Sequence, residues 1–236
     1  MISEEARNLS VIITGASSGI GRQVAIDLAS AGVKLLAIAR REDLLKQVRE
    51  TDKSHIDILS IDITCPENDS KILKWALSAS GVLGLINCAG IGEFGDFAEL
   101  PFESFEKQIA VNLLAPARLI HLLLPELIKR KGQIVNVLSV VCETIIPDSE
   151  AYSASKSGLQ MLSKVLSQSH RKQGLRVSCV IPGAVDTPMW AGKAFIPKKE
   201  DMLTPEAVSR IVCDVVLSPP DRNFDEILLT PPVGIS

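Results

Sequence analysis

LSVIITGASSGIG, residues 9–21, joins an apolar, β-branched run to a turn rich in glycine. The run at residues 9–14 predicts a buried strand, and a helix is expected from about Gly19 to Ala31. Glycines at 15, 19 and 21 allow a tight turn and let a ligand approach backbone N–H groups closely. The helix N-terminus then offers unpaired donors and the positive end of a dipole to a pyrophosphate. Because the turn lies between a first strand and a first helix, it favours dinucleotide binding over a turn that merely permits packing.

Beyond this turn, short β-branched runs alternate with longer helical patterns. Further strands are expected at residues 33–39, 55–62, 81–89, 132–139, 175–183 and 225–231. Further helices are expected at residues 42–50, 67–80, 102–131 (in one or two parts), 151–174 and 204–218. This alternation predicts one α/β domain over residues 1–236, with a doubly wound parallel sheet and helices on both faces. Right-handed crossovers are expected, and ligands should bind beyond the carboxyl ends of the strands.

Composition and charge argue against several functional classes. The net charge is -3, which argues against a nucleic-acid partner. The segment MISEEARN has no apolar core and predicts no secretory signal. The most apolar helical stretch, residues 113–130, is interrupted by Pro116, Arg118, His121 and Pro125, so no membrane span is expected.

The cysteines and histidines predict no metal site. Five cysteines are spread widely with no C-x-x-C pair, which is typical of reduced thiols in a cytoplasmic protein rather than disulfides or zinc ligands. The three histidines are isolated from one another, so no ligand cluster is expected.

A basic pair follows the second expected strand. A dinucleotide fold that prefers NAD places an acidic residue about 20 residues beyond the glycines, where it binds the ribose hydroxyl. Here that neighbourhood reads Ala39-Arg40-Arg41. A guanidinium can pair with a 2′-phosphate through two hydrogen bonds, so the pair favours NADP over NAD. The alternative is that both arginines are solvated loop charges.

Tyr152 and Lys156 in the segment YSASK are four residues apart and therefore neighbours on one face of the expected helix. An ammonium close to a phenol lowers the pKa of the phenol from about 10, and Tyr152 is the only tyrosine. Ser139, at the end of the fifth strand, could hydrogen-bond a substrate oxygen, although serine also commonly turns loops. Asn112 is a polar residue in an apolar helix and is expected to hold a water or a backbone carbonyl near Lys156.

Taken together, these motifs resemble the short-chain dehydrogenase/reductase family. The segments that carry the resemblance, in the family's order and spacing, are TGASSGIG, NCAG (residues 87–90), Asn112, Ser139, YSASK and PGAVDTP (residues 182–188). The resemblance implies a Rossmann-type sheet of about seven strands and a homodimer or homotetramer. It also implies hydride transfer between a nicotinamide cofactor and a small carbonyl or alcohol substrate. Tyr152 would then be the general acid or base, Lys156 its partner, Ser139 the group that orients the substrate oxygen, and Asn112 the support of a proton relay.

The resemblance also assigns the cofactor site position by position. Arg40 matches the residue that contacts the 2′-phosphate. The other positions implied to bind the cofactor are Gly15, Ser17, Ser18, Gly19, Ile20, Gly21, Asp62, Ile63, Asn87, Ala89, Gly90, Tyr152, Lys156, Pro182, Gly183, Val185 and Thr187. Two positions depart from the family pattern. Cys88 stands where a second asparagine is common, and Ser18 stands where many NADP-preferring members carry a basic residue.

Two other interpretations remain open. A non-catalytic dinucleotide-binding sensor or scaffold would keep the glycine turn without needing the Ser139–Tyr152–Lys156 set. Dehydration or epimerisation on the same fold is disfavoured by the absence of an added C-terminal substrate domain. A substrate lid is expected around Trp190 and Phe195, with Cys142 and Ile145 as further candidates for the pocket lining.

Overall fold

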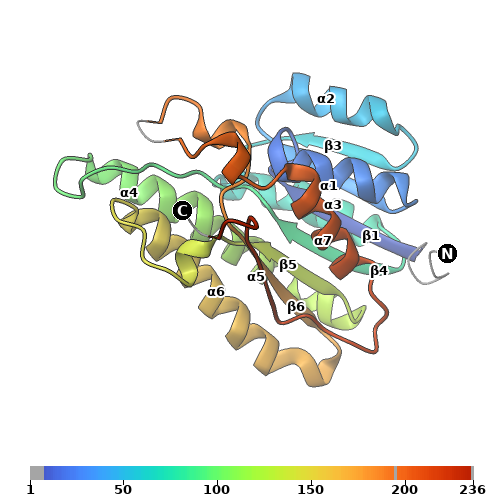
Figure 1. Cartoon of the computed structure of the whole chain (residues 1–236). Helices are drawn as coiled ribbons and strands as arrows, with labels where there is room; N and C mark the ends of the chain where they lie inside the picture. The colour runs from blue at the N-terminus through green and yellow to red at the C-terminus, as the bar shows by residue number, and fades with distance from the viewer. Residues whose placement is uncertain (1–7, 194–195, 235–236) are drawn as a thin grey trace.

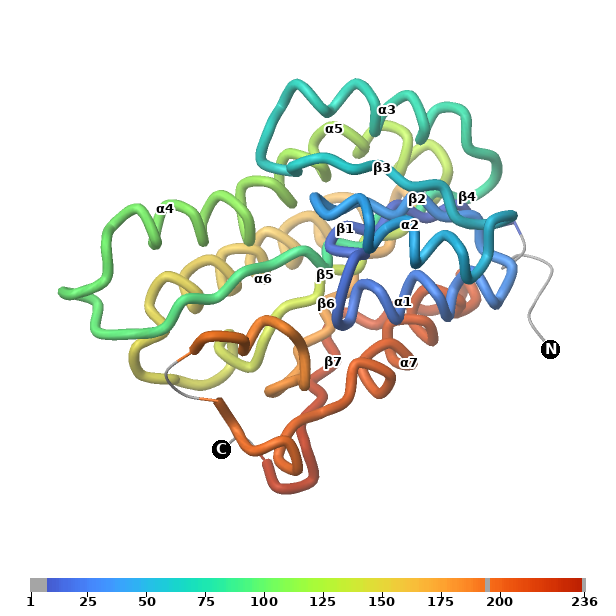
Figure 2. The backbone as a smooth tube through the Cα atoms, turned by 90° about the horizontal axis from the view of Figure 1, so that it is seen from above, coloured from blue at the N-terminus to red at the C-terminus, as the bar shows by residue number. Residues whose placement is uncertain are grey.

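A computed structural model describes residues 8–193 and 196–234. Its centre is a sheet of seven parallel strands in the order β3-β2-β1-β4-β5-β6-β7 (Figures 1 and 2). The strands are β1 Leu9–Thr14, β2 Lys34–Ala39, β3 Ile56–Ser60, β4 Val82–Asn87, β5 Gln133–Val137, β6 Arg176–Pro182 and β7 Glu226–Leu229. The order reverses next to β1, so the crevice between the ends of β1 and β4 is a topological switch point of the kind that binds ligands.

Helices cover both faces of the sheet, as the alternating pattern predicts. The longer helices are α1 Gly19–Ser30, α2 Glu42–Thr51, α3 Asp69–Ser78, α4 Phe102–Ile109, α5 Ala115–Lys129, α6 Glu150–His170 and α7 Pro205–Val216. Buried apolar side chains of α1, α2 and α7 form one core cluster with the sheet, and those of α3 and α5 form a second on the other face. Both clusters are mainly Val, Ile, Leu and Ala, in keeping with the 4% aromatic content.

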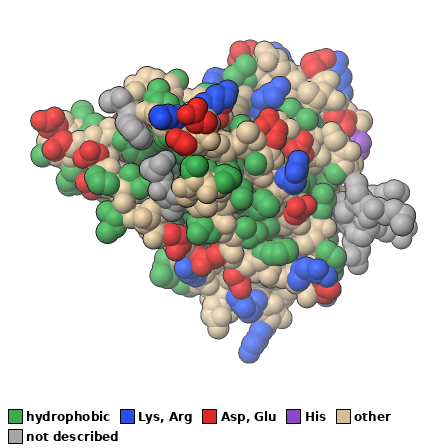
Figure 3. Space-filling model, viewed as in Figure 1, with side chains coloured by type: hydrophobic (Ala, Val, Ile, Leu, Met, Phe, Trp, Pro, Cys, Tyr) green, Lys and Arg blue, Asp and Glu red, His purple; other side chains and the backbone are tan. Residues whose placement is uncertain are grey.

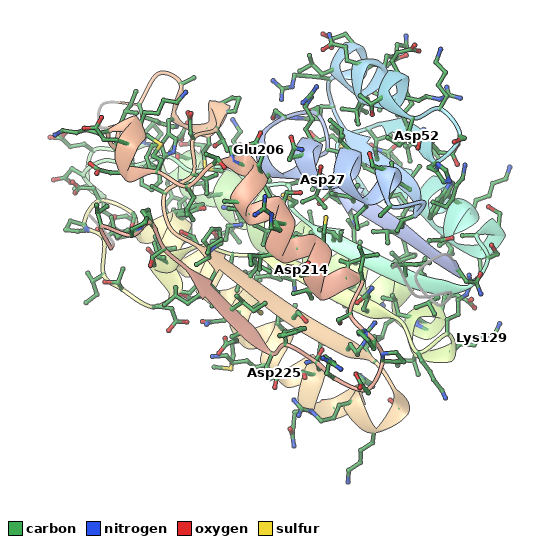
Figure 4. The ribbon with its side chains drawn as sticks, turned by 45° about the vertical axis from the view of Figure 1, so that its right-hand side comes forward. Asp27, Asp52, Lys129, Glu206, Asp214 and Asp225 are labelled. Atoms are coloured by element: carbon green, nitrogen blue, oxygen red, sulfur yellow. The ribbon has the colours of Figure 1, made fainter. Side chains whose placement is uncertain are left out.

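The connection from β6 to β7 departs from the expected handedness. The chain steps in one direction across the sheet through β4, β5, β6 and β7. The helix between β5 and β6 is α6, whereas α7, between β6 and β7, packs on the other face beside α1 (Figure 4). The β5-to-β6 and β6-to-β7 connections step in the same direction across the sheet, but their helices lie on opposite faces, so the two connections have opposite hands. The β6-to-β7 crossover is therefore left-handed, where the general rule predicts a right-handed one.

Pairing of α7 with α1 accounts for that exception. Val208 and Val212 are fully buried in the cluster shared with α1. The hydroxyl of Ser209 on α7 donates to the carboxylate of Asp27 on α1 over 2.6 Å (Figure 4). A left-handed connection is thus stabilised by an apolar interface and a buried hydroxyl that has its partner.

The long helical region is continuous from Phe102 to Lys129, with a π-helical turn, η3 (Ala110–Leu114), between α4 and α5. Contrary to the expectation from its prolines, it is long and apolar enough, by length and composition alone, to cross a membrane. Leu119, Leu123 and Leu127 are nonetheless buried against the sheet. Buried core helices share this length and composition.

Surface charge is mixed on the face seen in Figure 3, where Lys and Arg side chains are interspersed with Asp and Glu. The described residues of that face therefore agree with the small net charge of the chain. Beyond the carboxyl ends of the strands, the loops after β1, β4, β5 and β6 gather around two adjoining cavities. The chemistry is therefore to be sought there.

Candidate active site

The glycine turn after β1 packs directly on the end of β4. Gly15 has a left-handed φ of 74°, and a Cβ there would lie 2.8 Å from the backbone of Ala89. A Cβ on Gly21 would lie 2.5 Å from the carbonyl oxygen of Gly15. The Thr14 hydroxyl accepts hydrogen bonds from the N–H groups of Cys88 and Ala89, both at 3.2 Å. The turn therefore has no room for side chains at Gly15 and Gly21.

The first turn of α1 is open to an anion. Ser18 is the N-cap residue, but its side chain makes no capping hydrogen bond to the helix. N–H groups at a helix start that lack such a cap attract a phosphate, because they are unpaired donors at the positive end of the dipole. The residues present thus fit a pyrophosphate, as the glycine pattern predicts.

A cavity of about 400 Å³ extends from this turn across the ends of β1, β2 and β3. It brings together twelve of the predicted cofactor positions: Gly15, Ser17, Ser18, Gly19, Ile20, Gly21, Arg40, Asp62, Ile63, Ala89, Gly90 and Thr187. Asp62 accepts hydrogen bonds from the N–H (2.8 Å) and hydroxyl (2.7 Å) of Thr64. The N–H bond from Thr64 is the main reason that the pKa of Asp62 lies below its usual value.

Arg41, rather than Arg40, reaches the glycine turn. Its guanidinium donates to the hydroxyls of Ser18 (2.7 Å) and Ser17 (3.1 Å). Arg40 lines the same cavity, with its guanidinium 4.0 Å from the carboxylate of Asp62 and its side chain 68% exposed. The sequence pattern located the basic pair but gave no means of choosing between its members, since adjacent residues point in different directions only once the loop is folded.

A second cavity, of about 370 Å³, adjoins the first, and Ile20, Cys88, Gly90, Thr187 and Met189 line both. Its lining includes the predicted residues Ser139, Tyr152, Lys156, Pro182, Gly183 and Val185. Side chains from the ends of β5 and β6 and from α6 therefore meet beside the glycine turn. This is the arrangement that the motif order predicts.

The phenol of Tyr152 is buried, and burial raises its pKa to about 12. The hydroxyl of Ser139 opposes this shift, and the nearby thiols of Cys142 and Cys88 add to it. The expectation that Lys156 lowers the pKa of the phenol is therefore wrong for the chain alone. Burial is the largest cause of the raised pKa, and the Lys156 amine, 5.8 Å from the centre of the Tyr152 ring, donates its hydrogen bond to the carbonyl of Val137.

Lys156 is buried at the end of β5. Its amine donates a hydrogen bond to the carbonyl of Val137 over 2.9 Å. Burial lowers the pKa of this amine, because a charged group is costly in an apolar surrounding. A Cβ on Gly90 would lie 3.4 Å from this amine, so a glycine leaves the cavity open at that point.

Asn112 lies in the π-helical turn η3 and is fully buried. Its amide accepts from the N–H of Ile91 (2.9 Å) and donates to the carbonyl of Ile91 (2.8 Å) and to the hydroxyl of Ser155 (3.0 Å). The prediction that it binds a backbone carbonyl is confirmed, but that carbonyl belongs to Ile91 after β4. Single π-helical turns within α-helices are frequent at functional sites, and this one ties the loop after β4 to α6.

Asn87 is the predicted cofactor residue whose side chain lies outside both cavities. Its amide donates to Asn136 on β5 over 2.8 Å, and Asn136 donates to Ser163 on α6 over 2.7 Å. This chain of hydrogen bonds shows that the Asn87 side chain, at the end of β4, lies on the face of the sheet that α6 covers. The alternation of side chains along a strand, rather than the motif, decides this orientation.

Phe94 is a lining residue that the sequence analysis missed. Its ring lies edge-on to the Tyr152 ring (centroids 5.5 Å apart) and stacks on the ring of Trp190 (5.9 Å). The signal that could have found it is its position four residues after the NCAG segment, in the loop that leaves the end of β4.

Of the candidates for the lid and lining, Trp190 lines the second cavity, and Phe195 lies outside the described residues. Cys142 and Ile145 are absent from the described lining, and Ile145 is 93% exposed. Val140, Val141 and Ile146 line the cavity instead.

The described part of the chain contains no cluster of side chains suited to a metal ion. No group of three or more His, Cys, Asp or Glu side chains there could hold a metal ion. All five cysteines are free thiols.

Comparison with known proteins gives one family. The family model for short chain dehydrogenase matches residues 10–194. The chain is 31% identical over 204 residues to L-xylulose reductase of Caenorhabditis elegans, covering 85% of this chain and 81% of that protein.

Two solved structures share most of both chains. An alcohol dehydrogenase of the archaeon Thermococcus sibiricus, complexed with 5-hydroxy-NADP, superposes with a TM-score of 0.86 at 28% identity, covering 95% of this chain and 97% of that one. A metagenomic short-chain oxidoreductase in complex with NADP superposes with a TM-score of 0.81 at 28% identity, covering 97% and 99%.

Proposed function

The chain belongs to the short-chain dehydrogenase/reductase family of oxidoreductases, and on that premise we propose that it is an NADP-dependent enzyme that reduces the carbonyl of a small molecule or oxidises the corresponding alcohol. The observation that carries the proposal is the convergence of Ser139, Tyr152 and Lys156 on one cavity that adjoins the glycine turn. A sensor or scaffold would need only the turn.

The cofactor is a nicotinamide dinucleotide, which when bound supplies or accepts the hydride. We propose that its phosphates lie on the start of α1, at Ser17 to Gly21, and that its nicotinamide end lies against Pro182, Gly183, Val185 and Thr187. Support for this placement comes from the continuity of the two cavities and from the tight glycine turn between them.

In the proposed reduction, Tyr152 is the general acid. Its phenol is protonated at neutral pH, since a phenol ionises only near pH 10 and burial raises its pKa further. A proton is therefore available for the oxygen on which negative charge develops. Ser139 donates a hydrogen bond to the same oxygen. Fixed donors aimed at developing charge in an enclosed site contribute a large share of catalysis.

Lys156 and Asn112 take supporting roles in the proposal. The Lys156 amine is held at the end of β5 by Val137, from where it can bind a ribose hydroxyl of the cofactor. Asn112 is a positioning residue, since its side chain fixes Ile91 and Ser155 around the site. A proton relay from Lys156 would start at this end of the cavity.

NADP is proposed over NAD because of the basic pair after β2. Arg41 with Ser17 and Ser18 makes a cluster of donors at one end of the first cavity, and Arg40 lines the same cavity. A 2′-phosphate there would meet two guanidinium groups, each able to form charge-assisted hydrogen bonds. Arg41 thereby joins Arg40 as a candidate for recognition of this phosphate.

A homodimer or homotetramer is also proposed. Three apolar side chains, Leu114 at the end of η3 and Met161 and Val165 on α6, are each more than half exposed. Apolar surface of this kind is expected to be covered in an assembly. With its free thiols, the chain is proposed to work in the cytoplasm.

The test is a cofactor-oxidation screen of the purified chain over ketones, oxoacyl thioesters, semialdehydes and pterins, run with both NADPH and NADH. The proposal expects oxidation of NADPH with at least one carbonyl compound and a lower rate with NADH. Binding of NADPH without turnover of any compound in the panel would favour the sensor or scaffold instead.

A further inference from the structure

We propose that the substrate carries a bulky apolar group, best an aromatic one, and that the rings of Phe94 and Trp190 bind that group beside the reacting carbonyl. The inference rests on the proposed function, because it takes Tyr152 as the residue next to the reacting oxygen. Its evidence is the lining of the second cavity.

Phe94 and Trp190 form a stacked pair at the reactive phenol. Their ring centroids are 5.9 Å apart with an interplanar angle of 14°, and the Phe94 ring meets the Tyr152 ring edge-on at 5.5 Å. Both side chains line the cavity and are half-buried. The chain has only six phenylalanines and two tryptophans. Three of its aromatic rings meet at this cavity, whereas the other aromatic group, Phe97, Phe102 and Phe105, lies outside it.

Each ring of the pair is held in position by its own loop. The indole N–H of Trp190 donates to the carbonyl of Val185 over 2.9 Å. The Phe94 ring lies over the backbone of Gly92: a Cβ there would be 3.1 Å from that ring and 3.4 Å from the Tyr152 ring. The N–H of Gly95 donates to the carbonyl of Asp148 over 2.9 Å, tying the Phe94 loop to the loop before α6. A side chain fixed by such contacts loses little further freedom when it binds a ligand.

The rest of the substrate end of the cavity is also apolar. Val141 and Ile146 follow Ser139, and Met189 precedes Trp190. The charged residues among the described lining, apart from Lys156, are Asp148, Lys193 and Asp201, and each is exposed or half-exposed. A polar substrate tail would therefore lose its water without gaining buried partners, whereas an apolar tail loses nothing.

The site thus separates two kinds of carbonyl compound. Ser139 and Tyr152 would hydrogen-bond the carbonyl oxygen, and the rings of Phe94 and Trp190 would contact the substituent. A flat ring can pack against Phe94 and Trp190 in the offset or edge-on arrangements that aromatic groups prefer. The enclosed apolar contact would then distinguish apolar from polar substituents, since small changes in a ligand at such a contact alter its binding by about one to two orders of magnitude.

The experiment compares 4-phenyl-2-butanone with 4-hydroxy-2-butanone, two methyl ketones that differ only in the group at the fourth carbon. Isothermal titration calorimetry measures their binding to the chain alone and in the presence of NADP⁺, which cannot reduce them. Initial rates with NADPH give kcat/KM for the same pair. We expect the phenyl ketone to bind and to react roughly tenfold or more in preference to the hydroxyketone.

Phe94→Ala and Trp190→Ala should each lower that preference by roughly tenfold, and Gly92→Ala should lower it by displacing the Phe94 ring. Phe97→Ala is the matched control: it removes the same ring from the same loop, but Phe97 is 55% exposed and lies outside the second cavity. Thermal unfolding of each variant confirms that it is folded.

The outcomes separate the two claims. Preferential binding that is lost in Phe94→Ala supports the inference even if neither ketone is turned over, in which case only the proposed reaction fails. Equal or tighter binding of the hydroxyketone, or a preference that is unchanged in both Phe94→Ala and Trp190→Ala, would overturn it.

Discussion

The amine of Lys156 donates a hydrogen bond to the carbonyl of Val137 over 2.9 Å, while it lies 5.8 Å from the centre of the Tyr152 ring. The lysine thus occupies the end of β5, one helical turn from the phenol, and is bound to the backbone. A buried amine is costly, and burial lowers its pKa. The cost of burying the Lys156 amine at this place is understandable if the amine takes part in the reaction.

Lys156→Met tests that role. The substitution keeps the length of the side chain and removes both the buried charge and the bond to Val137. Removal of the buried charge stabilises the folded chain, whereas loss of the hydrogen bond to the Val137 carbonyl destabilises it. Because the two effects oppose each other, we expect the free energy of unfolding to change by less than about 2 kcal/mol. The kcat of the proposed reaction should fall by about 10² or more. Urea unfolding and initial rates measure the two quantities; a variant with normal kcat would contradict the assignment.

Tyr152 can be titrated on its own, because the chain has no other tyrosine. Burial raises the pKa of its phenol from 10.0 to about 12. The phenolate absorbance at 295 nm should therefore rise near pH 12 in the folded chain and near pH 10 in urea. A raised pKa means that the folded chain holds the proton more tightly, so this contribution to stability is complete below pH 10 and is lost as the pH rises toward 12.

Ser139→Ala should delay that titration further, since the Ser139 hydroxyl favours the ionised phenol. Circular dichroism recorded in parallel shows over which range the chain stays folded. Phenolate formation below pH 10 within that range would contradict the buried environment of Tyr152.

Arg41→Gln should weaken NADPH binding by about tenfold to a hundredfold and leave NADH binding almost unchanged, because it removes charge-assisted bonds to the 2′-phosphate alone. Arg40→Gln should have the smaller effect, since its side chain is 68% exposed and leans toward Asp62. Lys46→Gln, on α2 and paired with Glu42, is the charge-matched control. Fluorescence titration with both cofactors is the measurement, and equal losses for NADPH and NADH in Arg41→Gln would refute the proposal.

Gly15→Ala and Gly32→Ala separate backbone strain from steric conflict. Both glycines have a left-handed φ, 74° and 86°, but a Cβ on Gly32 meets nothing within 4 Å, whereas one on Gly15 lies 2.8 Å from Ala89. Gly32→Ala should lower the free energy of unfolding by about 1–2 kcal/mol. Gly15→Ala should cost about 1–3 kcal/mol more and should also abolish cofactor binding. Equal losses of stability in the two variants would show that the turn does not pack on β4 as described.

The fold was largely predictable from sequence, and one connection was not. Short β-branched runs and longer helical patterns locate all seven strands and the longer helices, because parallel strands buried on both faces read as continuous apolar runs. The left-handed step through α7 escaped prediction, because general handedness rules cannot foresee the pairing of Val208 and Val212 with α1.

The site was predictable to the level of segments. Glycines and serines of the turn, Ser139, Tyr152 and Lys156 do line adjoining cavities. Side-chain directions were beyond reach: Arg41 rather than Arg40 bonds to the turn, and Asn87 points into the protein. The depth of burial that raises the pKa of Tyr152 was likewise not readable from the spacing of Tyr152 and Lys156. Each depends on loop conformation or on strand alternation set by neighbours that are distant in sequence.

The most direct test of the account is kcat of Tyr152→Phe, measured beside its affinity for NADPH on the substrate that the cofactor-oxidation screen identifies. The substitution keeps the ring that contacts Phe94 and removes only the hydroxyl. The account predicts a loss of kcat by about 10² or more with NADPH affinity largely intact. Turnover at the rate of the native chain would contradict it, since the proton would then have come from another group.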